Sequence, residues 1–287
     1  MRAGSGQRRA RAALIGLALA LLGTAAFMWF HRAGPDERIA YKQWQGQPLH
    51  LDLFRAKGAA QRAPGAALVL FHGGGWAHGS PAQFHPQCRH FSRMGLHCIS
   101  VEYRVRLRHG STPADALQDA RDAMRHLRRQ AQALGLDPRR IAAGGGSAGG
   151  HLAAALGVGL PWPDPGHDPA WPVRPDALVL LNPVVDLSPG TPDHAPAGDA
   201  WASLSPLHHV GPGTPPTLIL HGSADTEVAP DSVRRYCTAA REAGGDCEVV
   251  WFEGAGHGFF NPGAEGGRHH DRANAEIERF LRQQGLL

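Results

Sequence analysis

The feature that most constrains the fold of this 287-residue chain is a series of short apolar runs with almost no polar interruption. The runs are AALVLF (66–71), CISVEY (98–103), ALVLLNPV (177–184), TLILH (217–221) and CEVVWF (247–252). Such Val-, Ile- and Leu-rich runs are typical of strands buried on both faces, which occur in parallel sheets covered by helices. We therefore predict an α/β fold with a mostly parallel central sheet and helices on both faces.

Helical spacing of apolar residues fills the gaps between these runs. We expect helices over 113–134, 147–156, 230–243 and 274–283, a short strand over 140–143, and an early antiparallel strand over 49–54. Gly135 is suited to end the first of these helices. Catalytic groups of such folds collect at the carboxyl ends of the strands, so the residues that follow each run are the ones to examine.

The stretch GGGSAGGH (144–151) follows the short strand and precedes a helix. It contains G-x-S-x-G, a pattern that a chain with 37 glycines matches by chance roughly 0.2 times. The strand-to-helix position supplies the missing context, because a nucleophile elbow exposes its serine on a sharp turn there. Ser147 is the predicted nucleophile, and the N–H of Ala148 is placed to face a developing oxyanion.

A second glycine cluster, HGGGW (72–76), directly follows the run at 66–71. Three successive glycines let backbone N–H groups face a cavity without intervening side chains. The position upstream of the elbow predicts an HGGG-type oxyanion loop.

The acid and the base are predicted from two later strand ends. Asp225 follows the strand at 217–221, and His257 lies in a glycine-flanked loop after the strand at 247–252. The order Ser147, Asp225, His257 is that of an α/β-hydrolase triad, in which histidine activates serine and the acid orients histidine. Asp186 and Glu227 are the alternative acids. No spacing of the 18 histidines favours a metal site, and no cofactor is expected.

These motifs resemble those of bacterial α/β-hydrolases of the hormone-sensitive-lipase-like group. The resemblance covers residues 38–285 and is greatest to the feruloyl/acetyl-xylan esterase-like branch. It rests on HGGGWAHGS (72–80), VEYR (101–104), GLDPRRIAAGGGSAGGHLAA (135–154), LNPVVDL (181–187), LILHGSADTEVAP (218–230) and GAGHGFF (254–260).

The resemblance implies an α/β-hydrolase catalytic domain over 38–287 that cleaves a small-molecule carboxylic ester with a small or medium acyl group. It also implies that the oxyanion donors are the amides of Gly74, Gly75 and Ala148, with Gly73 as a further participant. His72, Trp76 and His151 are then neighbours of the site.

The chain departs from members with a large helical lid. Only residues 31–71 lie between the N-terminal apolar run and HGGG, and they are predicted to be mainly strands. We expect cover from 161–175 and 188–215 instead. Their tryptophans, Trp162, Trp171 and Trp201, either pack within these loops or stack on a sugar or aryl group.

Residues 1–30 form a predicted targeting segment. The segment holds four arginines, all before residue 12, and no acidic residue, and residues 12–30 are uncharged. This length suits a membrane anchor, with the catalytic domain outside the cytoplasm; a cleaved secretory signal is the alternative. Without those arginines the chain holds 25 basic and 25 acidic residues, so nothing favours a nucleic-acid partner.

The four cysteines fall into two pairs that share the pattern C-x6-G-x2-C, Cys88 with Cys98 and Cys237 with Cys247. In each pair the first cysteine is predicted to lie in a helix and the second in the following strand. The rise per residue of a helix and of a strand brings the two cysteines level. We predict two local disulfides, which suit an exported protein.

Serine esterase is the leading functional prediction. An amidase of the arylformamidase kind shares the HGGxW and G-x-S-x-G motifs and remains an alternative. A catalytically silent hydrolase fold that only binds ligands is the other. The sequence names neither the natural ester nor the oligomeric state.

Overall fold

The computed structural model describes residues 34–58 and 64–287. The unit from Asp36 to Leu287 is built on one eight-stranded sheet in the order β1-β2-β4-β3-β5-β6-β7-β8. Its strands are β1 (Glu37–Trp44), β2 (Gln47–Phe54), β3 (Gly65–Phe71), β4 (His97–Val101), β5 (Leu136–Gly146), β6 (Ala177–Leu181), β7 (Thr217–Gly222) and β8 (Cys247–Phe252). The pairs β1–β2 and β2–β4 are antiparallel, and the strands from β4 to β8 are parallel to their neighbours. This is the predicted α/β-hydrolase fold.

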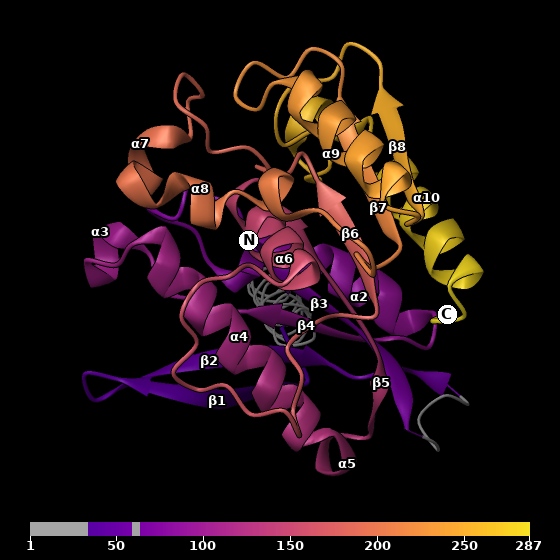
Figure 1. Ribbon diagram of the computed structural model, residues 1–287. Helices are drawn as coiled ribbons and strands as arrows, with labels where there is room; N and C mark the ends of the chain where they lie inside the picture. The colour runs from indigo at the N-terminus through magenta and orange to yellow at the C-terminus, as the bar shows by residue number, and fades with distance from the viewer. Residues whose placement is uncertain (1–33, 59–63) are drawn as a thin grey trace, which may run out of the picture. The chain divides into compact units, whose positions relative to one another are not determined.

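The longer helices divide between the two faces of the sheet (Figure 1). One face is covered by α4 (Pro113–Arg129), α6 (Ala148–Val158) and α9 (Pro230–Glu242), and the other by α2 (His85–Arg93) and α10 (His270–Gln283). Residues of β3 alternate between the two cores: Ala67, Val69 and Phe71 face the first, and Leu68 and Leu70 the second. Both faces are therefore buried, as the uninterrupted apolar runs require.

Short helices make up the rest of the described helical structure. They are α3 (Arg106–His109), α5 (Ala131–Leu134), α7 (His194–Ala197), α8 (Trp201–Leu204), and the 3₁₀ turns η2 (Pro81–Phe84), η3 (Gly198–Ala200), η4 (Pro206–His209) and η5 (Ala264–Gly267). The cover expected from 188–215 is thus a set of single turns. The helix predicted over 113–134 is two helices, because the chain leaves α-helical geometry at Gln130.

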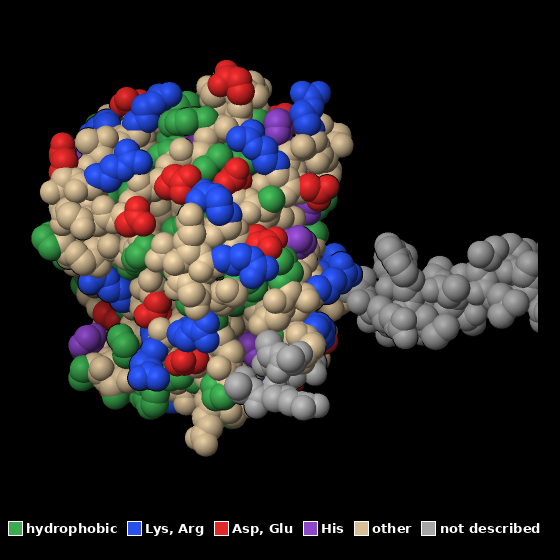
Figure 2. All heavy atoms as spheres, turned by 90° about the vertical axis from the view of Figure 1, so that its right-hand side faces the viewer, with side chains coloured by type: hydrophobic (Ala, Val, Ile, Leu, Met, Phe, Trp, Pro, Cys, Tyr) green, Lys and Arg blue, Asp and Glu red, His purple; other side chains and the backbone are tan. Residues whose placement is uncertain are grey.

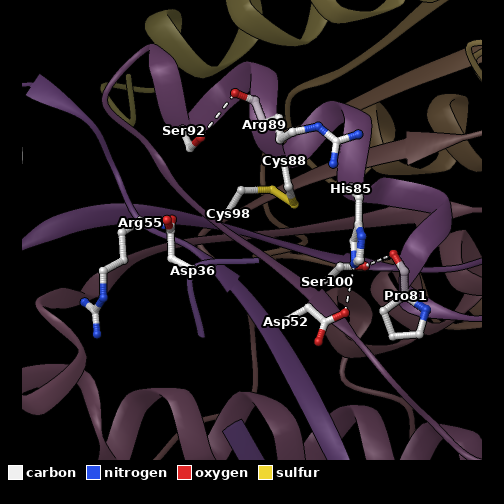
Figure 3. The surroundings of a disulfide bond; sticks show 10 residues. All are labelled: Asp36, Asp52, Arg55, Pro81, His85, Cys88, Arg89, Ser92, Cys98 and Ser100. Carbon is white, nitrogen blue, oxygen red and sulfur yellow. Dashed lines mark hydrogen bonds and ion pairs between the residues drawn. A yellow bond between two sulfur atoms is a disulfide. The ribbon is translucent and has the colours of Figure 1, made fainter. Parts of the chain in front are cut away.

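Both predicted disulfides are present. Cys88 in α2 bonds to Cys98 in β4 with 5.0 Å between their Cα atoms, and Cys237 in α9 bonds to Cys247 in β8 with 5.4 Å. Figure 3 shows the first bridge beside Ser100, whose hydroxyl donates to Pro81 O at 2.7 Å. The two bridges fasten helices on opposite faces of the sheet.

The predicted membrane segment lies outside the described residues. Within residues 34–58 and 64–287, no helix combines the length and apolar character needed to cross a bilayer. On the face that carries the C-terminal elements, basic and acidic side chains are interspersed (Figure 2).

Candidate active site

A cavity of about 400 Å³ opens at the carboxyl ends of the parallel strands. It brings together residues from segments far apart in the chain: the HGGG loop, the turn after β5, the turn after β6 and the loops after β7 and β8. The lining residues are Gly73, Gly74, Gly75, Ala77, His78, Gln83, Gly146, Ser147, Asn182, Glu227, His257, Gly258, Phe260 and Asn261.

Ser147 occupies the sharp turn between β5 and α6 with φ 53° and ψ −119°. A non-glycine residue at positive φ is strained, and such strain is typical of functional sites. The turn is held by Ser147 N, which donates to Leu181 O at 3.0 Å. Gly149 is required for close packing, because a Cβ there would overlap Phe71 O at the end of β3. The local geometry is that of a nucleophile elbow.

The HGGG loop lies against this elbow, since a Cβ on Gly73 would be 3.5 Å from the Cβ of Ser147. Within the described residues, the N–H groups of Gly74, Gly75 and Ala148 donate to no protein acceptor. They are free to bind an oxyanion. Gly73 differs, because its N–H donates to Gln83 Oε1 at 2.7 Å. Gly73 therefore supports the loop and does not supply an oxyanion donor.

Asp225 and His257, the predicted acid and base, form a hydrogen-bonded pair. His257 Nδ1 lies 2.9 Å from Asp225 Oδ2 and donates to it, while Asp225 Oδ1 accepts the N–H groups of Glu227 and Val228. Burial raises the pKa of Asp225, but these hydrogen bonds offset it and the pKa lies below the usual value. The carboxylate is therefore ionised at neutral pH and fixes the tautomer of the imidazole.

The pKa of His257 lies above its usual value. Burial lowers it, but the hydrogen bond to Asp225 and the negative charges of Asp225, Glu227 and Asp193 outweigh that effect. In an ordinary environment the pKa of His257 would lie near 6.5; the three surrounding carboxyl groups make the environment different.

Neither alternative acid binds Nδ1 of His257. Asp186 accepts hydrogen bonds from Ser188 and from Arg235 Nη1, which holds the start of the 188–215 segment. Glu227 Oε2 lies 3.8 Å from Nε2 of His257. Asp225 binds the other ring nitrogen, Nδ1. Neither alternative acid is placed to orient the imidazole through Nδ1.

Asn182 is a site residue that our sequence analysis did not identify. It is fully buried at the end of β6, and it has a positive φ of 37°. Its Oδ1 accepts the N–H of Gly258 at 3.1 Å, so its Nδ2 faces His257 Nε2 at 3.3 Å. The side chain thereby links β6 to the histidine loop. Its position at a strand end is the sequence signal that could have revealed it.

Within the described residues, no hydrogen bond joins Ser147 to His257. Both side chains line the same cavity, and the Nε2 of His257 faces Asn182. Catalytic hydrogen bonds of ligand-free enzymes are often long and shorten when substrate binds.

The predicted neighbours of the site pack beneath it. His72 is buried, stacks on Tyr103 with 4.1 Å between ring centroids, and contacts Gly73 O through Nδ1. Trp76 is 2% exposed and meets His151 edge to face. Burial lowers the pKa values of His72 and His151 to about 4, so both are neutral at pH 7. These residues support the HGGG loop and α6 rather than line the cavity.

The loop tryptophans are also absent from the cavity lining. Trp162 and Trp201 pack against the core that contains α4 and α6, and Trp171 lines a separate hollow with Arg129. Packing within the loops is therefore the role that the structure gives Trp162 and Trp201. Among the described residues, no group of three His, Cys, Asp or Glu side chains is arranged to hold a metal ion.

Comparison with known proteins assigns the chain to a family. A family model described as alpha/beta hydrolase fold matches residues 68–203, and a prolyl oligopeptidase family model matches residues 183–284. The native esterase Est2 of Thermogutta terrifontis is 37% identical with a TM-score of 0.82, over 88% of this chain and 93% of that one. The chain is a hormone-sensitive-lipase-like α/β-hydrolase.

More distant relatives are also esterases. Esterase LipC of Mycobacterium tuberculosis is 31% identical to this chain. The match covers 73% of this chain and 56% of LipC. The chain spans about half the length of LipC and of two further Mycobacterium tuberculosis relatives, LipM and LipQ, with coverage of 52% to 56%. The broad group is thereby established, while the feruloyl/acetyl-xylan branch stays a prediction.

Proposed function

We propose that the protein is a carboxylesterase that hydrolyses esters of short carboxylic acids through Ser147, His257 and Asp225. The observation that carries the proposal is the convergence in one cavity of a strained serine, a carboxylate-bound histidine and the HGGG amides. These are the parts that acyl transfer through a serine requires.

In the proposed reaction, His257 Nε2 takes the proton of Ser147 as Oγ attacks the ester carbonyl. The carbonyl oxygen becomes an oxyanion and accepts hydrogen bonds from Gly74, Gly75 and Ala148. The intermediate collapses, and the alcohol leaves with the proton from Nε2. Water then enters, gives a proton to Nε2 and releases the carboxylic acid by the same sequence of steps.

Short acyl groups are favoured by the size and polarity of the cavity. The cavity volume of about 400 Å³ must hold both the acyl and the alcohol portion of an ester. The cavity walls include polar side chains such as Gln83 and Asn261. Structures of the Thermogutta esterase are described as propionate-bound and butyrate-bound. We propose that the cavity of this chain accepts acyl groups of similar length.

Two measurements test the proposal. A fluorophosphonate probe should label the wild-type protein at Ser147 and leave Ser147→Ala unlabelled. A p-nitrophenyl ester series should give the highest kcat/KM between acetate and butyrate, and feruloyl esters and N-formylkynurenine should be poorer substrates. Absence of labelling would favour a binding protein, and preference for N-formylkynurenine would favour an amidase.

We also propose that residues 12–30 anchor the protein in a membrane, with the catalytic domain outside the cytoplasm. The uncharged run, the preceding arginines and the two disulfides support this proposal. The full-length protein should fractionate with membranes and resist extraction by high salt. Release of a soluble form that begins near residue 27 would show instead that the segment is a cleaved signal.

A further inference from the structure

The side of His257 that faces the substrate is acidic. Asp225 holds Nδ1 from below, so Nε2 is the nitrogen that exchanges protons with Ser147 and with the departing alcohol. Glu227 Oε2 lies 3.8 Å from this same Nε2 and lines the cavity. The alcohol oxygen that takes a proton from Nε2 therefore lies close to the Glu227 carboxylate.

The backbone holds Glu227 in place. Its N–H donates to Asp225 Oδ1 at 2.9 Å, which ties the residue to the carboxylate that orients the base. The side chain itself is 71% exposed, so it reaches the mouth of the cavity rather than its floor. The charge therefore lies where the alcohol portion of a bound ester is closest to solvent.

The described part of the cavity lining contains no lysine or arginine that could balance this charge. Among the described residues that line the cavity, Glu227 is the one carboxylate, and none is a lysine or an arginine. Asp193, in the 188–215 segment, adds a second carboxyl group near His257 and Glu227, with a pKa that burial raises to about 6. The local field therefore favours positive charge on the alcohol side.

We infer that Glu227 is a specificity-determining residue that selects esters by the charge of their alcohol portion. Cationic alcohols are preferred, neutral ones are accepted and anionic ones are discriminated against. This inference rests on the proposed esterase function. Because Glu227 is largely exposed, we expect a preference of about three- to tenfold per unit charge, and we expect it to weaken as salt increases.

Three acetate esters of matched size test the inference. Acetylcholine is cationic, 3,3-dimethylbutyl acetate is its neutral counterpart, and 3-acetoxypropane-1-sulfonate is anionic. The wild type should give kcat/KM values in the order cationic, neutral, anionic at low ionic strength. In Glu227→Gln, which keeps the side-chain length and the backbone N–H, the three values should converge. Comparing ratios within each enzyme removes any change in acylation that all three esters share.

Glu253→Gln is the matched control, because Glu253 is an exposed carboxylate outside the cavity lining. It should keep the wild-type ratios. Equal rates for the three esters in the wild type, or a charge preference retained by Glu227→Gln, would overturn the inference. Failure of the wild type to hydrolyse even the neutral ester would instead contradict the proposed esterase function.

Discussion

Two regions of the molecule differ in backbone strain and in rigidity: the residues around the cavity, and the two helix–strand pairs that are linked by disulfides. Two of the five non-glycine residues with positive φ in the described chain, Ser147 and Asn182, directly follow β5 and β6 and line the cavity, and a third, Trp76, packs behind the HGGG loop. The linked pairs α2–β4 and α9–β8 are regular, buried and closed by covalent bonds.

The backbone strain is concentrated at the cavity, and the disulfide-linked pairs contribute to the stability of the fold. Strained residues and amides without protein acceptors are unfavourable in themselves, and they persist because the sheet beneath over-determines their positions. The helix–strand pairs supply part of that rigidity. Substitutions at the cavity should therefore change rate with little effect on unfolding, and substitutions in the linked pairs should do the reverse.

The largest effect should come from Ser147→Ala. Removal of the nucleophile should lower kcat by roughly 10⁴- to 10⁶-fold. Thermal unfolding should be unchanged or slightly improved, because the hydroxyl makes no hydrogen bond within the described residues. Steady-state kinetics and calorimetry of the purified variant check both halves. Full esterase activity would remove Ser147 from the mechanism.

Asp225→Asn should lower kcat by about 10⁴-fold, because an amide nitrogen facing His257 favours the wrong tautomer. Asp186→Asn is the matched comparison, since it removes a carboxylate that binds Arg235 and not His257. A large loss of kcat in Asp186→Asn, with little in Asp225→Asn, would move the acid to the earlier strand.

Loss of the second disulfide should affect stability alone. The double variant Cys237→Ala, Cys247→Ala opens a loop of ten residues' separation, and the free energy of unfolding should fall by about 2–3 kcal/mol. Denaturant unfolding measures this change. At a temperature where the variant is folded, its kcat should equal that of the wild type, and a large fall in kcat would show that the two regions are coupled.

Asn182→Ala tests the link between β6 and the histidine loop. The variant loses the hydrogen bonds to Gly258 N and to His257 Nε2, and we expect kcat/KM to fall by about tenfold. The pH profile separates positioning from mere packing: without the Nδ2 donor, which stabilises neutral imidazole, the acidic limb should move to higher pH. An unmoved limb would reduce Asn182 to a packing role.

The smallest effect concerns the acidic limb itself. His257 must be neutral to accept a proton, so kcat/KM should rise with pH through its pKa, which lies above 6.5. Glu227→Gln removes a negative charge that stabilises the imidazolium, so the limb should shift to lower pH. Glu253→Gln should leave it in place, and a shift of equal size there would point to general surface charge.

Local sequence was sufficient for most of the fold. The predicted strand at 247–252 matches β8. The first residue of each of the other apolar runs lies within two residues of the first residue of the observed strand. Uninterrupted apolar residues predict such strands because both faces of a parallel sheet are buried. The strand predicted over 140–143 is longer, since β5 begins at Leu136 through pairing with β3 that includes Gly65. That pairing depends on a distant segment, which local patterns do not reveal.

For the site, the sequence by itself determined which residues stand at strand ends, and chain order then nominated Ser147, Asp225 and His257. It also predicted both disulfides, because each pair spans one helix–strand connection. Only the tertiary structure decided which ring nitrogen each carboxylate approaches, that Gly73 N–H is taken by Gln83, and that Asn182 contacts the histidine loop. These contacts join residues from different strand ends, and their distances follow from how the strands pair and the loops pack, not from spacing along the chain.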